Sequence, residues 1–202
     1  MKLRDGSGRI WEVFISRDGE STTLSSLSCE GELSPVPSLT IQSGGGEDSV
    51  RLIVAGPQNP DPDSARYMAE KGLGEGVEFV GAPTFEDLPS YHHSADIFVS
   101  PALGRESFGM VIAEAMAAGK PCIVSDIAGH RSVIGSLDNA ILTEPRDEMS
   151  LKNAIKFLID NPDERERLGK AGQEKAKEYD WPVVADQVYD YYEKVLENTG
   201  KQ

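Results

Sequence analysis

The sequence predicts an α/β fold, in which helices cover both faces of a parallel sheet and a helical tail follows. Two observations predict it. Short, apolar, β-branched segments alternate with helical segments from residue 50 to residue 143, which is typical of βαβ units. After Pro145 only helical patterns remain, with apolar residues three and four positions apart. We expect right-handed crossovers, which place helices on both faces of the sheet.

The expected elements follow in order along the chain. Strands are expected at residues 50–55, 77–81, 96–100, 121–125 and 139–143, and helices at residues 62–73, 85–94 and 108–118. In the tail, Leu151, Ile155 and Leu158 form the apolar face of one helix, and a second helix begins at Glu164. A last helix begins near Pro182, where Trp181 is expected to anchor it to the core.

The first 47 residues have a different composition, rich in Ser, Gly and Thr. An apolar stretch at residues 10–15 and a second short stretch at residues 21–24 flank the turn residues Asp18 and Gly19, which indicates a hairpin. Proline- and glycine-rich segments then indicate a linker. We therefore expect an atypical N-terminal segment at residues 1–47 and one α/β domain at residues 48–202.

Composition limits the function. The 202 residues suffice for one domain or two small ones, and 39% of them are hydrophobic, as in globular proteins. With 20 basic and 34 acidic side chains the net charge is −14, which disfavours nucleic acid as a partner. Two cysteines, no signal-like start and no long apolar stretch favour a cytoplasmic location, with peripheral contact at the inner membrane face left open.

The most informative stretch runs from Gly104 to Pro121, beyond the third expected strand, where parallel sheets bind ligands. Ser107 is a candidate cap of the helix that follows. The first backbone N–H groups of this helix, with the positive end of its dipole, form an anion site suited to a diphosphate. These N–H groups belong to Gly109, Met110 and Val111. Glu106 precedes the helix and Glu114 lies about one and a half turns inside it, so the two carboxylates could hold the two ends of a nucleotide-sugar.

Each of these residues also has a structural interpretation. Glu106 could be a solvated loop charge, and Glu114 could pair with a nearby lysine or arginine. His92 and His93 are adjacent and share no helix face, which favours surface or sheet packing over a ligand role. His130 is expected in a turn at the edge of the cleft, where contact with a ligand is the alternative.

The stretch Gly-Arg-Glu-Ser-Phe-Gly-Met-Val-Ile-Ala-Glu-Ala-Met-Ala-Ala-Gly-Lys-Pro, with seven residues between its first and second glutamates, closely resembles the motif of retaining GT-B glycosyltransferases of family 4, the glycosyl transferases group 1. The segment from Leu88 to Pro101 resembles the same family's approach to this motif, and Tyr179-Asp180-Trp181 resembles the end of phosphatidylinositol α-mannosyltransferases. The resemblance covers residues 48–197. It implies the Rossmann-like C-terminal half of a GT-B fold.

The resemblance also implies site residues. Glu106 would be catalytic, binding hydroxyls of the donor sugar closest to the anomeric carbon, and Glu114 would bind the ribose hydroxyls. The other substrate-binding residues implied are Ser107, Phe108, Gly109, Met110 and Val111 around the sugar and diphosphate, and Gly81, Ala82 and Pro83 bordering the base.

The implied reaction is transfer of a hexose with retained configuration, with mannose from GDP-mannose as the expected donor. The acceptor would be a phosphatidylinositol-type lipid or a glycan. The donor is a GDP- or UDP-sugar, and neither a tightly bound cofactor nor a metal is implied. Only the donor half of such an enzyme is expected here, without the family's arginine and lysine that clamp the donor phosphates, so this chain alone would be catalytically incomplete.

Two alternatives stay open. The chain could be a non-catalytic nucleotide-sugar-binding or assembly module that recruits an N-terminal acceptor domain on another chain or forms a homo-oligomer. It could also be another nucleotide-sugar enzyme of GT-B shape, such as an epimerase.

Overall fold

A computed structural model describes most of the chain. The described residues are 13–18, 21–26, 49–50, 52–55, 59–60, 62–72, 77–103 and 106–199. The linker expected before residue 48 and residues 104–105 of the motif lie outside them.

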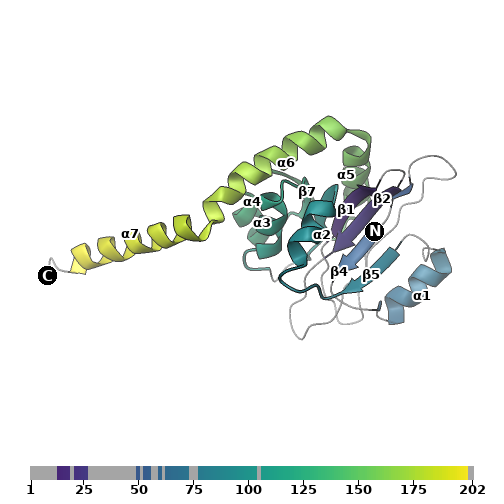
Figure 1. Cartoon of the computed structure of the whole chain (residues 1–202), viewed down its shortest axis with the longest axis horizontal. Coiled ribbons are helices and arrows are strands. Elements are labelled where there is room, and N and C mark those ends of the chain that lie inside the picture. The colour runs from purple at the N-terminus through teal and green to yellow at the C-terminus, as the bar shows by residue number, and fades with distance from the viewer. Residues whose placement is uncertain are drawn as a thin grey trace.

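An eight-stranded sheet lies at the centre of the fold (Figure 1). Its strands are β1 (Val13–Asp18), β2 (Ser21–Ser26), β3 (Ser49–Val50), β4 (Leu52–Ala55), β5 (Val77–Gly81), β6 (Ile97–Ser100), β7 (Cys122–Ser125) and β8 (Ala140–Thr143). Their order is β3-β2-β4-β1-β6-β7-β8, and β5 pairs with β4. The α/β fold class predicted from the sequence is confirmed.

Pairing directions agree with the prediction except at one strand. β4 and β5 are parallel, and so are β6, β7 and β8. The expected hairpin is confirmed, because β1 and β2 are antiparallel, with Asp18 opposite Ser21. β1, however, also lies antiparallel between β4 and β6, so the sheet is mixed at this position.

The central strands divide their side chains between two cores with the period of two that a strand imposes. Ile97, Val99 and Ile123 belong to one core cluster, whereas Phe98 and Val124 belong to the other. Because both faces are buried, these strands consist of continuous apolar residues, as buried parallel strands do.

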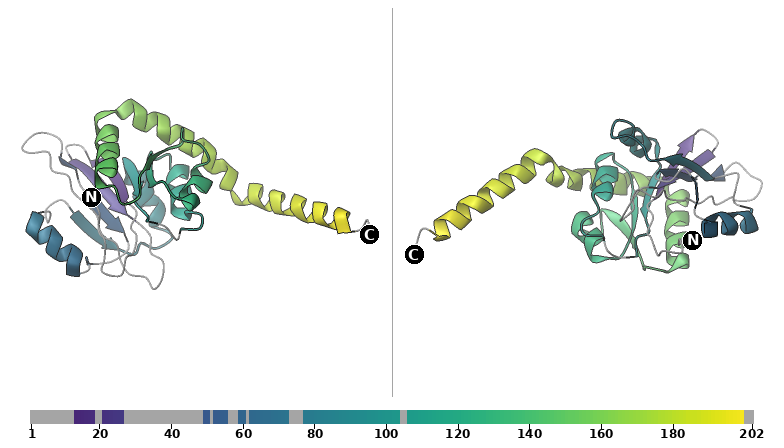
Figure 2. Two further views of the ribbon diagram at one scale, coloured as in Figure 1. Left: turned by 180° about the vertical axis from the view of Figure 1, so that it is seen from behind. Right: turned by 90° about the horizontal axis from the view of Figure 1, so that it is seen from below.

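Helices cover both faces (Figures 1 and 2). They are α1 (Pro62–Lys71), α2 (Leu88–Ser94), α3 (Met110–Ala117), α4 (Ala128–Ile134), α5 (Glu148–Asp160), α6 (Pro162–Ala176) and α7 (Trp181–Thr199). Helix α5 packs on the face of Ile97 through residues such as Leu151 and Leu158, while α3 and α4 cover the face of Phe98. A side-chain cap begins α5, since the Asp147 carboxylate accepts hydrogen bonds from the amides of Met149 and Ser150.

Helix α6 lies across the end of α3 at a pair of glycines. A Cβ atom added at Gly169 would lie 2.3 Å from the carbonyl oxygen of Gly119, so only glycine allows this approach. Gln173 of α6 also donates a hydrogen bond to the carbonyl of Ala117. The C-terminal end of α3 is therefore held against α6.

Helix α7 extends away from the rest of the fold (Figures 1 and 2). The expectation that Trp181 anchors this helix in the core is wrong, because 78% of Trp181 is exposed. Tyr189, Tyr191, Tyr192 and Leu196 are exposed on the same helix. Among the described helices, none has the length and apolar character needed to cross a bilayer.

Candidate functional site

The loop that leads into α3 is built around the Glu106 carboxylate. Glu106 Oε1 accepts hydrogen bonds from the backbone amides of Gly109 at 2.9 Å and Phe108 at 3.3 Å. Gly109 precedes the helix with a φ of 85°, a left-handed conformation that glycine adopts without strain. Helix α3 consequently begins at Met110, two residues later than predicted.

This arrangement corrects two expectations about the helix tip. Ser107 does not cap α3, because the N-cap residue is Gly109 and no side chain caps the helix. The Gly109 amide, just before the helix, donates its hydrogen bond to the Glu106 carboxylate instead. A carboxylate is favoured there by the helix dipole. The Gly109 amide is therefore not free for a ligand in this state, whereas Met110 and Val111 carry the first N–H groups of the helix, which have no acceptor within it.

The side chains around this tip face different environments. The Phe108 ring packs edge-on against Tyr179, with ring centroids 5.2 Å apart. Its backbone amide makes the hydrogen bond to Glu106 described above. Val111 packs against the core cluster of Phe98, while Met110 and Ser107 are exposed. These positions leave the backbone, rather than the Phe108 and Val111 side chains, to contact a ligand.

Helix α4 packs against the loop that leads into α3 at Gly129. A Cβ atom added at this buried glycine would lie 2.2 Å from the carbonyl oxygen of Glu106. The backbone of α4 thus touches the backbone of the candidate catalytic residue. The sequence did not predict α4.

His130 ties the same helix to two strand ends. It is fully buried, its Nδ1 lies 2.9 Å from the carbonyl oxygen of Ser125, and its Nε2 lies 3.3 Å from Ser100 Oγ. Burial lowers the pKa of His130, although the hydrogen bond to Ser125 and the charge of Glu106 act to raise it. The neutral ring therefore donates from Nδ1 and accepts the Ser100 hydroxyl at Nε2. His130 lies in a helix rather than the expected turn, and its contacts are structural.

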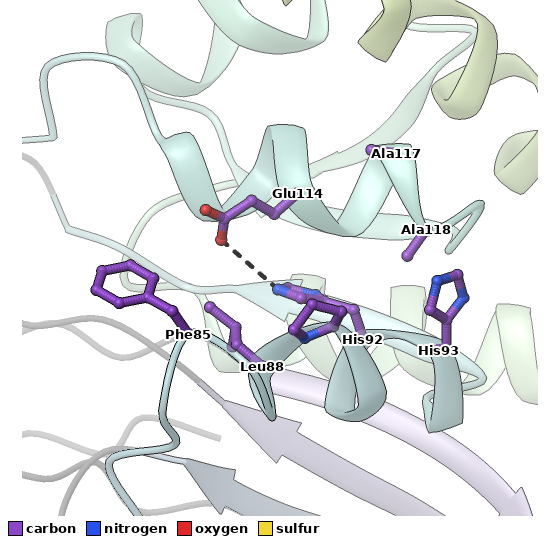
Figure 3. A pocket seen from close by; sticks show the side chains of 8 residues that line it. Phe85, Leu88, His92, His93, Glu114, Ala117 and Ala118 are labelled. Carbon is purple, nitrogen blue, oxygen red and sulfur yellow. Dashed lines mark ion pairs between the residues drawn. The ribbon is translucent and has the colours of Figure 1, made fainter. Parts of the chain in front are cut away.

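Glu114 lies further along α3 and faces α2. Its side chain is 43% exposed, and its Oε2 lies 3.6 Å from Nε2 of His92 (Figure 3). The side chain that faces this carboxylate is a histidine, not the lysine or arginine of the structural interpretation. Lys120 instead donates a hydrogen bond to the carbonyl of His93, at 2.8 Å.

A pocket of about 320 Å³ lies between α2 and α3 at this carboxylate. Its lining is Phe85, Leu88, Pro89, His92, His93, Glu114, Ala117 and Ala118. Phe85 and Leu88 lie at the end toward which the Glu114 carboxylate points, and His93 and Ala118 lie at the other end (Figure 3). Phe85 is 94% exposed, so an aromatic ring is available at the mouth. Sequence reasoning did not single out Phe85.

Gly81 ends strand β5, and Ala82 and Pro83 follow it before the turn into α2. Gly81 is buried with a φ of 71°, Ala82 is exposed, and none of the three lines the pocket, which begins at Phe85. Their contact with a base stays a prediction. Glu106 does not line this pocket either.

Beyond the tip, the Asp126 carboxylate binds the Arg131 guanidinium at both oxygens, one of them 2.6 Å from Nη2. These hydrogen bonds lower the pKa of Asp126. Among the described residues, no group of three or more His, Cys, Asp or Glu side chains could hold a metal ion.

The chain is similar to known proteins. A family model described as "Glycosyl transferases group 1" matches residues 37–175. The phosphatidyl-myo-inositol mannosyltransferase of Mycobacterium leprae is 36% identical over 154 residues, which cover 76% of this chain and 40% of that protein. The D-inositol 3-phosphate glycosyltransferase of Corynebacterium glutamicum is 29% identical over 150 residues, which cover 73% of this chain and 36% of that protein.

Among solved structures, sucrose-phosphate synthase from Thermosynechococcus elongatus superposes with a TM-score of 0.66 at 30% identity, covering 74% of this chain and 39% of that one. The chain spans about 40% of the length of the mannosyltransferase relative. The family match over residues 37–175 and the superposition on a solved structure show that this chain belongs to the glycosyl transferases group 1, which have the GT-B fold.

Proposed function

We propose that this chain is the donor-binding part of a retaining glycosyltransferase and binds a nucleotide-diphosphate sugar at the tip of α3. The observation that carries the proposal is the position of two glutamates, one before that tip and one inside the helix. Glu106 precedes α3, and Glu114 lies about 6 Å further along the helix axis than Met110, beside a pocket of about 320 Å³. A pocket of this volume is at the lower end of the range for small-molecule sites.

Each part of the site would contact one part of the donor. The Met110 and Val111 amides and the helix dipole would bind the diphosphate. Glu114 would accept hydrogen bonds from the ribose hydroxyls, and the base would lie toward Phe85 and the residues that end β5. Backbone amides fix Glu106 Oε1, so Oε2 would be oriented toward hydroxyls of the sugar near the anomeric carbon.

The expected sugar is mannose, carried by GDP, because the relative that is 36% identical is a mannosyltransferase. The expected acceptor is a phosphatidylinositol-type lipid or a glycan, which would place the protein in the cytoplasm with peripheral contact at the inner membrane face. Flotation with phosphatidylinositol vesicles tests the lipid acceptor. Protein that stays in the dense fraction would argue for a soluble glycan.

Isothermal titration calorimetry with GDP, UDP, GDP-mannose and UDP-glucose tests the donor site. Hydrogen bonds to a charged group are worth about 1.5–3 kcal/mol, so Glu114→Ala should weaken binding by roughly tenfold or more. Glu193→Ala removes an exposed carboxylate on α7 and should leave affinity unchanged. Equal affinity of the Glu114→Ala variant and the unaltered chain would count against the proposed site.

The exposed aromatic residues of α7 favour a second candidate function, a non-catalytic assembly module. In this role the exposed side chains of Tyr191 and Tyr192 would bind an acceptor domain on another chain. Copurification with such a chain, and transferase activity only in the mixture, would support this role. Full activity of the isolated chain would exclude it.

A further inference from the structure

One of the residues that line the pocket, beside Glu114, is a buried histidine. His92 is 2% exposed, and its ring packs at a tilt against Phe98 of the central strand, with centroids 6.0 Å apart. Its Nε2 faces the Glu114 carboxylate at 3.6 Å (Figure 3). Glu114 therefore extends from a fixed imidazole into the open pocket.

We infer that His92 is the positioning residue for Glu114 and, through it, makes the site select ribonucleotides over deoxyribonucleotides. This inference rests on the proposed donor site. A half-exposed glutamate samples several rotamers, and holding it in one of them costs conformational entropy. A buried ring that faces one carboxylate oxygen restricts those rotamers and leaves the other oxygen for vicinal hydroxyls.

The structure also fixes the distance between the two helices. Lys120, just beyond the end of α3, donates a 2.8 Å hydrogen bond to the carbonyl of His93, so α2 is tied to the segment after α3. Packing on Phe98 holds the other side of the His92 ring. The gap of 3.6 Å is longer than a hydrogen bond of about 2.7–3.2 Å, and a small rotation of Glu114 closes it when hydroxyls bind the outer oxygen.

The test compares ribose with 2′-deoxyribose ligands. Affinities for GDP and dGDP, and for UDP and dUDP, are measured by calorimetry for the full chain and its variants. We expect Glu114→Gln to reduce the preference for the ribonucleotide by roughly tenfold, and His92→Phe by about three- to tenfold. His92→Gln keeps a donor near the Nε2 position and should restore part of the preference.

Two controls separate positioning from a merely structural role. Tyr91→Phe removes a polar group from the preceding residue of α2 and should leave the preference unchanged. In the double variant His92→Phe/Glu114→Gln, the preference should be no lower than in Glu114→Gln alone, because His92 acts only through Glu114. Thermal melting of each variant reports its folding independently.

The outcomes distinguish a failure of the role of His92 from a failure of the proposed donor site. If neither nucleotide binds, or if Glu114→Gln leaves affinity unchanged, the donor site itself is refuted and the inference with it. If Glu114→Gln reduces the ribose preference while His92→Phe, folded, retains it in full, only the role of His92 is refuted. A preference that falls equally in the Tyr91→Phe variant also refutes it.

Discussion

Replacing Gly129 with alanine tests whether α4 sets the position of Glu106. The added Cβ would lie 2.2 Å from the Glu106 carbonyl oxygen, whereas non-bonded carbon and oxygen atoms lie about 3.3 Å apart or more. The two backbones must therefore separate by about 1 Å. Such overpacking costs about 1–3 kcal/mol, partly offset by up to about 1 kcal/mol of helix propensity.

The matched control is Gly169→Ala, whose Cβ would lie 2.3 Å from the Gly119 carbonyl at the opposite end of α3. Both variants should melt about 2–8 °C below the unaltered chain in differential scanning calorimetry. Only Gly129→Ala should also weaken nucleotide-sugar binding, by about tenfold or more, since a 1 Å displacement of a positioning loop disturbs the contacts that depend on it. Equal affinities of the two variants would refute the link between α4 and Glu106.

Three further predictions concern charge and capping. Because burial lowers the pKa of His130, the unfolded chain binds a proton more readily, so the free energy of unfolding should fall as pH drops below about 6.5. Urea titrations at several pH values should show this slope reduced in His130→Gln, and an unchanged slope would contradict it. Since Arg131 lowers the pKa of Asp126, Arg131→Ala should raise that pKa toward its ordinary value in an NMR titration. The contribution of the Asp126–Arg131 pair to stability is present above about pH 4 and is lost as pH falls through the lowered pKa. Asp147→Ala removes the cap of α5 and should lower the free energy of unfolding in urea by about 1 kcal/mol. Asp147→Asn should retain most of the stability that the cap contributes.

Much of the fold could be predicted from the sequence, because it depends on local patterns. The buried strands at Ile97–Ser100 and Cys122–Ser125 are continuous apolar runs, and buried parallel strands require such runs. The place of β1 could not be predicted, because its antiparallel pairing with β4 and β6 depends on partners far along the chain. The exposure of Trp181 could not be predicted either, because tryptophan favours burial and only the direction of α7 determines that this side chain is exposed.

The candidate site shows the same division. The sequence predicted that Glu106 would precede α3 and that Glu114 would lie inside it, as the structure shows. The contact between Glu106 and the Gly109 amide was not predicted, because it depends on the left-handed φ of Gly109. Adjacent histidines in the sequence gave no sign of which would be buried. Packing on Phe98 determines that His92 is buried while His93 is exposed.

The residues that line the pocket all lie within one continuous segment, from Phe85 to Ala118. This segment is shorter than the chain that separates β1 from β6, so the loop-closure entropy lost on forming the pocket is somewhat smaller than that of pairing these two strands. The two helices and the strand between them should consequently open as one cooperative unit, separately from the N-terminal hairpin. Native-state hydrogen exchange would then report one common opening free energy for the amides of α2, β6 and α3, and a lower one for β2.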